Sequence, residues 1–380
     1  MSNNTVSFAV IGAGMMAKEF ASAAARWCHL NGNGLKPQII AAASRSDASL
    51  GWFRDQIPTL EQASTDYHDI LANPRVQAVY CAVPHQLHEE MYTDILRSGK
   101  HLMGEKPFGI DQPAFDRIHA EATLHPELLV RCASQFIYFP GMMRMIRMAK
   151  EKAFGKIISV EAGFLHSSDL NPNKPINWKR QVATCGEYGC MGDLGMHVLM
   201  ILLRAGWQPR NVYSTLTIIL STRPGADGQP AVCDTWDNAL LTCAASDEDG
   251  QEFPLLIKAC RIAPGHQNTL YLHVEGTQCS AQFSTQNPKM FSYMPYSPDG
   301  EQAWRQVELG NQSAYPVISG SIFEFGFSDA LMQLWAAFMD ELSGNSPAFA
   351  APNLKETAAG HALLTAALKS QKEKMPVSIA

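Results

Sequence analysis

Short apolar runs recur along the first third of the chain, and each is followed by a turn and then by a segment with helical spacing. The runs lie at residues 6–11, 38–43, 76–83, 101–103 and 129–133. Strand-length runs that alternate with helical segments predict a doubly wound parallel sheet made of βαβ units. Because the carboxyl ends of such strands lie along one edge of the sheet, the turns that follow the runs are expected to meet there.

The second half of the chain has a different pattern. Residues 207–220 and 234–241 alternate apolar and polar positions like strands, and further strand-like segments follow up to residue 274. Glycine-containing turns separate these segments. Residues 327–342 and 354–370 have the apolar spacing of amphipathic helices. This pattern predicts a second region of sheet that ends in helices.

Composition narrows the class of protein. A chain of 380 residues is too long for one ordinary core, and 46% hydrophobic with 17% charged residues fits a soluble globular protein. A net charge of -6 without a basic face argues against nucleic-acid binding. No apolar run could span a bilayer, and the N-terminus lacks a signal-peptide pattern. Nine scattered cysteines indicate reduced, mostly buried thiols and a cytoplasmic location.

A strand, a glycine-rich turn and a helix follow one another at the start of the chain. The turn has the sequence Gly12-Ala13-Gly14-Met15-Met16-Ala17, with the G-x-G-x-x-A spacing of a dinucleotide-binding fingerprint. Gly12 would make the tight turn, Gly14 would let the backbone approach a pyrophosphate, and the helix N-terminus would face the phosphate charge. The spacing alone is weak evidence, but its place between strand and helix predicts a dinucleotide site.

The residues after the second apolar run bear on which dinucleotide binds. An acidic residue at this strand end usually accepts the ribose 2′-hydroxyl of NAD. This chain has Ser44, Arg45 and Ser46 instead. A solvated arginine is the plain alternative, but Arg45 could also face a 2′-phosphate or stack on adenine. The sequence therefore favours NADP, and NAD remains the other candidate.

The strand that ends near residue 103 is followed by Gly104-Glu105-Lys106-Pro107. Proline cannot donate a ladder hydrogen bond, so the strand must stop there, and Lys106 then projects at the edge where open α/β sheets bind ligands. An isolated Glu-Lys pair is usually just solvated. Here, however, three earlier strands end at the same edge of the sheet, and this favours a ligand-binding site over a solvated pair. The sharp turn also predicts a cis peptide bond before Pro107.

A loop with several glycines enters an apolar helix at residues 189–203. Asp193 and His197 are four residues apart, so they share one helical face. A carboxylate in that place can orient an imidazole and stabilise its cation, which suits a general base. A capping aspartate beside a buried histidine is the commoner arrangement, but the predicted cofactor site favours catalysis. No third ligand has suitable spacing for zinc, and we predict no metal.

Together these motifs resemble the glucose-fructose oxidoreductase and inositol dehydrogenase family (Gfo/Idh/MocA). The resemblance runs from about residue 6 to about residue 375 and rests on the G-x-G-x-x-A turn, Val-Pro-x-x-x-His at 83–88, Glu-Lys-Pro at 105–107, and the segments 192–197 and 274–277. It implies an α/β protein with an N-terminal Rossmann domain, residues 1–132. It also implies an α+β domain with a large, mostly antiparallel open sheet, residues 133–380.

The expected contacts follow from the motifs and from this resemblance. Cofactor contacts are expected from Gly12, Gly14, Met15, Met16, Ser44, Arg45, Pro84, His88, Glu105 and Lys106. Substrate contacts are expected from Tyr138, Trp178, Lys179, Arg180, Asp193 and His197. Family members often carry an arginine where this chain has Phe136 and Ile137, so contacts of that arginine do not transfer.

Residues 171–180 form a polar, proline-bearing segment. Trp178 could stack on a sugar face, and Lys179 and Arg180 could pair with an anionic group. A solvated basic loop with one buried tryptophan fits the sequence equally well. Anionic sugars therefore belong among the expected substrates.

We expect an NAD(P)-dependent oxidoreductase that interconverts a secondary alcohol of a sugar, sugar acid or polyol and its ketone. His197 would take the hydroxyl proton, Lys106 would hold the substrate oxygen, and Asp193 would orient His197. Two alternatives stay open on the same fold: a redox-neutral glycosidase that oxidises, eliminates, hydrates and reduces, and a non-catalytic NAD(P)- and sugar-binding protein. The large sheet suggests a homodimer or homotetramer through one of its faces.

Overall fold

The computed structural model describes residues 4–32 and 34–379. Contacts divide the chain into two compact units. Unit 1 consists of residues 1–138, 313–320 and 326–357, and unit 2 consists of residues 139–312, 321–325 and 358–380. The sequence predicts a single boundary after residue 132, because nothing in its pattern marks the later return of the chain to the first unit.

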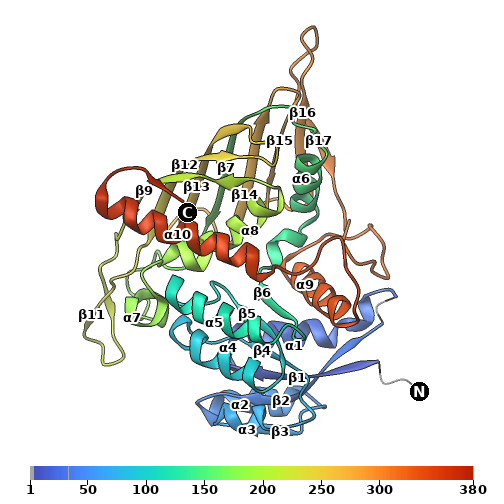
Figure 1. Cartoon of the computed structure of the whole chain (residues 1–380), viewed down its shortest axis with the longest axis vertical. Coiled ribbons are helices and arrows are strands. Elements are labelled where there is room, and N and C mark those ends of the chain that lie inside the picture. The colour runs from blue at the N-terminus through green and yellow to red at the C-terminus, as the bar shows by residue number, and fades with distance from the viewer. Residues whose placement is uncertain (1–3, 33, 380) are drawn as a thin grey trace. The chain divides into compact units, whose positions relative to one another are not determined.

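Unit 1 is built on a six-stranded parallel sheet with the strand order β3-β2-β1-β4-β5-β6 (Figure 1). Its strands are β1 Thr5–Ile11, β2 Lys36–Ala43, β3 Gln62–Ser64, β4 Ala78–Cys81, β5 His101–Glu105 and β6 Val130–Ala133. Its helices are α1 Met15–Ala25, η1 Trp27–His29, α2 Asp47–Gln56, α3 Tyr67–Leu71, η2 His85–Leu87, α4 His88–Arg97, α5 Gln112–Leu124, η3 Gln135–Tyr138 and α9 Phe327–Leu342. The order reverses between β1 and β4, as in a doubly wound dinucleotide-binding sheet. The predicted Rossmann fold is confirmed, although the sequence analysis missed the short polar edge strand β3.

Helix α9 joins unit 1 through an aromatic cluster. The ring of Trp335 lies 5.5 Å from Phe8, 3.8 Å from Phe20 and 4.9 Å from Tyr80. All four side chains are buried. Burial of rings this large supplies much of the stabilisation of a core, which is why α9 packs with the parallel sheet far from its place in the sequence. The sequence predicted this helix with its bounds but not its location.

Unit 2 is built on a ten-stranded mixed sheet, of which the path β17-β16-β15-β14-β7-β13-β12-β9-β18 forms the main part and β8 pairs with β12. Its strands are β7 Ile157–Leu165, β8 Gln208–Pro209, β9 Asn211–Thr217, β12 Asn238–Ser246, β13 Glu252–Cys260, β14 Thr269–Gly276, β15 Cys279–Ser284, β16 Met290–Pro295, β17 Arg305–Glu308 and β18 Val377–Ser378. A separate hairpin consists of β10 Thr222–Pro224 and β11 Pro230–Val232. Among the described strands of this sheet, only β7 and β13 pair in parallel, so the predicted large, mostly antiparallel sheet is confirmed.

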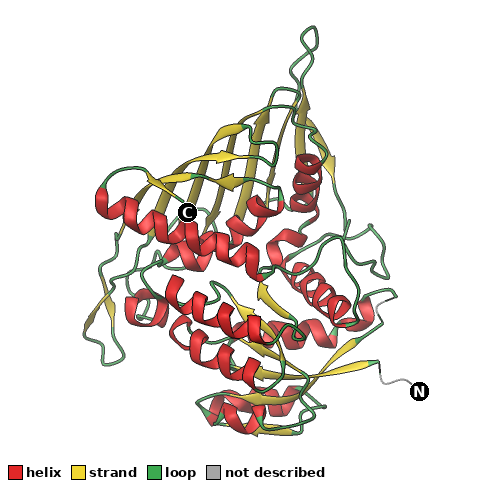
Figure 2. Ribbon diagram, viewed as in Figure 1, coloured by secondary structure: helices red, strands yellow, loops and turns green. Residues whose placement is uncertain are grey.

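Helices cover one face of this sheet (Figure 2). The helices of this unit are α6 Pro140–Lys150, η4 Trp178–Arg180, α7 Val182–Cys185, η5 Met191–Gly195, α8 Met196–Arg204 and α10 Leu354–Glu373, which belongs to unit 2 from residue 358. Gly360 lets α10 approach α8, because a Cβ there would lie 2.5 Å from the sulfur of Met196. On the other face, side chains such as Tyr213 and Leu240 are exposed between buried neighbours.

The methionines at 142, 143 and 145 lie on the buried face of α6. All nine cysteines fall within the described residues and are free thiols; Cys28 is exposed and the others are buried. The prediction that most of the cysteines are buried is therefore confirmed. Among the described helices, none has both the length and the apolar character needed to cross a membrane.

Candidate active site

The fingerprint turn joins β1 to α1 at the point where the strand order reverses. Gly12 has a φ of 93°, in the region that favours glycine. A Cβ at this position would lie 2.3 Å from the carbonyl oxygen of Ala82, just beyond the end of β4. Glycine is therefore required both by the backbone conformation and by the close approach of two neighbouring strand ends. This is the crevice in which doubly wound sheets bind dinucleotides.

The N-terminus of α1 is open toward this crevice. Gly14 is the N-cap residue, and no side chain caps the helix or places a carboxylate in its first turn. Nothing lies within 4 Å of a Cβ built on Gly14. The first backbone N–H groups of α1 therefore have room for an anion, which the helix dipole favours. Met15, the next predicted contact, is 74% exposed, and Met16 is half-buried. These features fit the pyrophosphate of a dinucleotide.

The end of β2 carries the residues expected to select the cofactor. Ser44 is half-buried, and its N–H donates to the carbonyl oxygen of Ser64 on β3. Arg45 is exposed, whereas the nearby Asp47 pairs with Arg54. The carboxylate of Asp47 is thus held by its own helix, and Arg45 is the exposed charge immediately after the strand.

The segment after β5 is held tightly. A Cβ on Gly104 would lie 2.6 Å from both the Tyr92 and the Phe108 rings, so glycine is required there. The hydroxyl of Tyr80 donates to Glu105 Oε1 at 2.6 Å, and the hydroxyl of Tyr92 donates to the Glu105 carbonyl oxygen at 3.0 Å. Burial, with the Glu105 charge next, raises the pKa of Tyr80, so its hydroxyl stays protonated and donates.

Lys106 follows directly at the strand end and is half-buried. The Lys106–Pro107 peptide bond is cis, as predicted. Phe108 then has a φ of 71°, which is unusual for a bulky residue and indicates a backbone held by its surroundings. The lysine therefore projects from a rigid, strand-anchored position, as a substrate-holding group requires.

His88 supports this segment from α4. Its side chain is fully buried. Its Nδ1 accepts from the N–H of Gly109 at 3.2 Å, and its Nε2 lies 3.1 Å from the carbonyl oxygen of Val83. Both bonds are satisfied by a neutral ring with the proton on Nε2. His88 thus connects the end of β4, next to the half-buried Pro84, to the residues after Pro107.

In unit 2, Asp193 lies in η5, a single π-helical turn that leads into α8. The sequence analysis expected a loop at this place, followed by an α-helix. A π turn widens the helix by one residue and is frequent at functional sites. Asp193 is 4% exposed and His197 is 5% exposed. The His197 ring packs edge-on against Phe164 of β7, with ring centroids 5.7 Å apart.

The Asp193 carboxylate is held by two cations. Lys179 Nζ lies 3.0 Å and 3.1 Å from its two oxygens. Arg261 Nε lies 3.6 Å from Oδ2, and Arg261 Nη1 donates to the carbonyl oxygen of Lys179 at 2.6 Å. Burial alone would lower the pKa of Arg261, but the charge of Asp193 together with the thiols of Cys185 and Cys190 outweighs burial and raises that pKa. Asp193 is therefore a carboxylate oriented by two cations, next to the helix that carries His197.

The side chain of Arg180 has a different environment from that of Lys179. Its side chain is fully buried and pairs with Asp237, which is also fully buried, and with Asp169 at 3.6 Å. The partners of Lys179 and Arg180 in the structure are thus carboxylates of the protein itself. Whether Lys179 also meets an anionic substrate stays a prediction.

The two aromatic candidates for substrate binding have protein contacts of their own. Trp178 is half-buried, and Lys179 Nζ lies 5.6 Å from its ring centroid. Tyr138 is fully buried, and its hydroxyl donates to the carbonyl oxygen of Phe349 at 3.1 Å within unit 1. Lys106 and Tyr138 belong to unit 1, whereas Trp178, Asp193 and His197 belong to unit 2.

Arg261 is a site residue that the sequence analysis missed. It follows β13, a strand of otherwise mainly apolar residues. Lys106 was identified as a candidate because it follows an apolar strand directly, and Arg261 follows β13 in the same way. It was overlooked because no recognisable motif surrounds it.

Comparison with known proteins agrees with this geometry. The model of an oxidoreductase family with an NAD-binding Rossmann fold (Gfo/Idh/MocA) matches residues 6–129. Levoglucosan dehydrogenase of Pseudarthrobacter phenanthrenivorans is 24% identical over 237 residues, which cover 59% of each chain. An uncharacterised oxidoreductase of Synechocystis is 24% identical over 232 residues, or 60% of each chain. The chain thus spans about 60% of the length of these curated relatives.

A solved structure of levoglucosan dehydrogenase, in complex with NADH and L-sorbose, has the same fold. It superposes with a TM-score of 0.88 at 20% identity and covers 99% of both chains. The resemblance predicted from the motifs is confirmed. Residues 6–129 match the model of the Gfo/Idh/MocA oxidoreductase family with its NAD-binding Rossmann fold, and the whole chain has the fold of a dehydrogenase similar to that family.

Proposed function

We propose that this protein is an NAD(P)-dependent oxidoreductase that interconverts a secondary alcohol of a sugar, sugar acid or polyol and its ketone. The observation that carries the proposal is the position of Lys106. It projects from the end of β5, two strands from the Gly12 turn of β1, on a segment fixed by Tyr80, Tyr92 and His88. A rigid cation at this edge of a dinucleotide-binding sheet suits a group that holds the substrate oxygen.

In the proposed reaction, the chain's own residues bind the substrate oxygen, transfer the proton and orient the base. The nicotinamide ring, when bound, accepts the hydride. Lys106 holds the alcohol oxygen and stabilises negative charge that develops on it. His197 takes the hydroxyl proton, and Asp193, held by Lys179 and Arg261, keeps the imidazole oriented and stabilises its cation.

The test is to incubate the protein with a panel of sugars, polyols, sugar acids and glycosides, each with NAD and with NADP. Nicotinamide absorbance measures cofactor turnover, and an assay for free sugar measures glycoside cleavage. Steady reduction of the cofactor with at least one alcohol supports the proposal. Sugar release from a glycoside without net cofactor consumption would identify a redox-neutral glycosidase instead. Tight binding with neither reaction across the panel would identify a non-catalytic binding protein.

The names of the relatives support sugars as the substrate class. The structural relative described above was solved with NADH and L-sorbose, and another structure of that enzyme contains levoglucosan. We propose that the substrate of this chain is likewise a cyclic or open polyhydroxy compound. Lys179 lies beside Trp178 and is only half-buried, which extends the proposal to sugar acids.

For the cofactor, we propose NADP in preference to NAD. Arg45→Ala should weaken NADP binding about tenfold or more and NAD binding much less, because a charge-assisted hydrogen bond to a phosphate is worth about 1.5–3 kcal/mol. Titration of each reduced cofactor, followed by its fluorescence, measures both affinities. Arg97→Ala is the control, since Arg97 is an exposed arginine of the same unit paired with Glu121. Equal losses for the two cofactors would show that Arg45 does not bind the 2′-phosphate.

We also propose a homodimer or homotetramer that forms through the open face of the ten-stranded sheet. Tyr213 and Leu240 are 40% and 37% exposed on that face, on the paired strands β9 and β12. Burying such side chains favours association. Leu240→Glu should therefore lower the molar mass measured by light scattering, while Leu124→Glu, at a 73% exposed leucine of unit 1, should not. A monomeric wild-type protein would contradict the proposal.

A further inference from the structure

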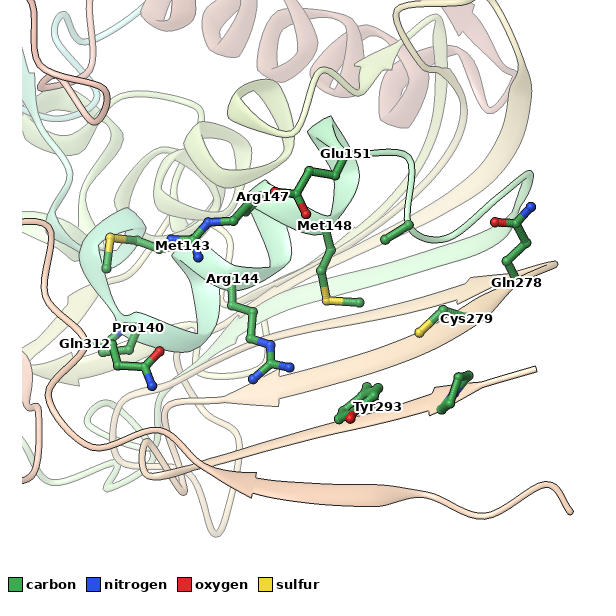
Figure 3. Close-up of a pocket in the computed structure, with 12 residues that line it drawn as sticks. Pro140, Met143, Arg144, Arg147, Met148, Glu151, Gln278, Cys279, Tyr293 and Gln312 are labelled. Carbon is green, nitrogen blue, oxygen red and sulfur yellow. The ribbon is translucent and has the colours of Figure 1, made fainter. Parts of the chain in front are cut away.

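A cavity lies within unit 2, between helix α6 and the strands β15 and β16 (Figure 3). Its volume is about 550 Å³, within the range of about 300–1,000 Å³ that small-molecule sites occupy. It is lined by Pro140, Met143, Arg144, Arg147, Met148, Glu151, Ala153, Gln278, Cys279, Tyr293, Pro295 and Gln312. None of these residues belongs to the cofactor, substrate or catalytic groups assigned above.

The helix and the sheet that form this cavity are fixed to each other. A Cβ on Gly141 would lie 2.0 Å from the ring of Phe283, so glycine lets α6 rest directly on β15. Five lining residues come from one face of α6, at the helical spacing of positions 140, 143, 144, 147 and 148, and Glu151 is the C-cap residue of the same helix. The strands supply the opposite wall. The cavity is therefore a formed feature of the packed unit rather than a gap beside a loop.

Arg144 crosses the cavity from the helix toward the sheet, as Figure 3 shows. Its guanidinium carbon lies 4.5 Å from the centroid of Phe291, a fully buried ring, and 5.3 Å from that of Tyr293. Stacking on two rings holds the guanidinium plane in one orientation and covers its faces. Its N–H edge is what remains for hydrogen bonding.

No partner in the described part of the chain uses that edge. Among residues 4–32 and 34–379, no side chain forms an ion pair with Arg144 or Arg147, and no protein atom accepts a hydrogen bond from either guanidinium. Glu151 is the single carboxylate of the lining, so two arginines face one glutamate. The cavity thus carries an excess positive charge on an arginine already oriented for a planar, two-oxygen acceptor.

We propose that this cavity binds a small organic anion whose carboxylate or phosphate is held by Arg144. The thioethers of Met143 and Met148 and the ring of Pro295 offer apolar contact to the body of the ligand, and Gln278 and Gln312 offer polar contacts at the rim. With one net positive charge in the lining, a ligand with a single negative charge matches it best.

The test is calorimetric titration of the full-length protein, at low ionic strength and with saturating NADPH so that the dinucleotide site stays filled. The probes are benzoate with neutral benzamide, glucose 6-phosphate with neutral glucose, and inorganic phosphate. Arg144→Gln removes the proposed anchor, and Arg144→Lys keeps the charge but not the planar fork. Arg305→Gln is the matched control, because Arg305 lies 6.0 Å from the Tyr293 ring but does not line the cavity.

We expect at least one organic anion to bind, and its neutral partner to bind far more weakly. Arg144→Gln should lower that affinity about tenfold or more, Arg144→Lys should lower it partly, and Arg305→Gln should leave it unchanged. The carboxylate and phosphate probes show which oxyanion is preferred. If Arg144→Gln does not fold, the affinity of Arg144→Lys for the organic anion tests the proposal by itself. The proposal is overturned if no organic anion binds at millimolar concentration, or if binding is the same without Arg144. Neither result depends on oxidoreductase activity.

Discussion

His197→Ala should lower kcat for alcohol oxidation by about 10²–10⁴-fold while NAD(P) binding stays nearly unchanged, because a positioned general base contributes that much to rate. His197 is at the start of α8 in unit 2, whereas the dinucleotide fingerprint is in unit 1. Steady-state kinetics give kcat, and titration with the reduced cofactor gives its affinity. A variant with near-full turnover would show that another group, such as Tyr138 or Lys106, is the base.

His361→Ala is the matched control for this experiment. His361 is also a fully buried histidine of unit 2, and its Nδ1 lies 3.3 Å from the hydroxyl of Tyr188. Its loss should lower the melting temperature without a comparable loss of kcat in the folded enzyme. If both variants lost activity equally, the effect of His197→Ala would reflect damage to the unit rather than a missing base.

The direction of the pH dependence gives a second readout. Oxidation requires neutral His197, so its rate should fall toward acid pH as the ring becomes protonated. Ketone reduction requires the proton, so its rate should persist at acid pH. His197→Ala should flatten both profiles. An unchanged oxidation profile in that variant would contradict the assignment.

The other proposed site residues are expected to differ in their effects. Asp193→Asn keeps the shape but loses the charge, so kcat should fall by no more than in His197→Ala. Lys106→Ala should lower kcat and also weaken the cofactor, because Lys106 follows directly on the strand edge that faces it. Lys179→Met removes one of the two cations at Asp193 and leaves Arg261 in place. Its effect on neutral sugars should therefore be smaller than that of Asp193→Asn.

The sequence was sufficient to predict most strands of unit 1, because the local sequence patterns there agree with the fold that forms. The apolar runs became β1, β2, β4, β5 and β6, and the glycine turn meets the β4 end as the fingerprint requires. The cis bond at Pro107 also followed from local chemistry. The edge strand β3 did not, because its three residues, Gln62, Ala63 and Ser64, form no apolar run and gain their structure only by pairing with β2.

The environment of Asp193 could not be predicted in the same way. Its spacing to His197 was visible, but its cations come from 14 residues before it, at Lys179, and from the end of β13, at Arg261. The sequence shows a basic segment at 179–180 and cannot show that its partners are protein carboxylates. A pair such as Arg180 and Asp237, 57 residues apart, exists only after the sheet of unit 2 has formed.

That buried pair leads to the largest stability effect that we expect. Arg180 and Asp237 are both 0% exposed, and the second oxygen of Asp237 accepts from the N–H groups of Ile219 at 2.7 Å and Leu220 at 2.9 Å. Asp237→Ala would leave a buried arginine without its main partner and two backbone N–H groups without their acceptor. Removing one member of such a pair costs about 3–5 kcal/mol.

The residues around the Arg180–Asp237 pair do not compensate for the stability lost in Asp237→Ala. Asp169, the other carboxylate near Arg180, is already engaged by Lys174 at 2.7 Å. Burial alone would raise the pKa of Asp169, but the Lys174 hydrogen bond and the charges of Lys174, Arg180 and Arg261 outweigh it and lower that pKa. A carboxylate with a lowered pKa stabilises the fold above its ordinary pKa, and this contribution is lost as the pH falls through the lowered value. Asp237→Ala should therefore be most easily unfolded in acid.

Urea unfolding, followed by tryptophan fluorescence, measures these effects. Asp237→Ala should lower the midpoint strongly, and Arg180→Met less, because Asp237 would retain its two backbone donors. The double variant Arg180→Met/Asp237→Leu should be more stable than the sum of the single losses, since no charge is left unpaired. Lys150→Met, which breaks the exposed pair with Glu248 in the same unit, should change the midpoint little. If Asp237→Ala behaved like Lys150→Met, the Arg180–Asp237 pair would not be what stabilises this part of unit 2.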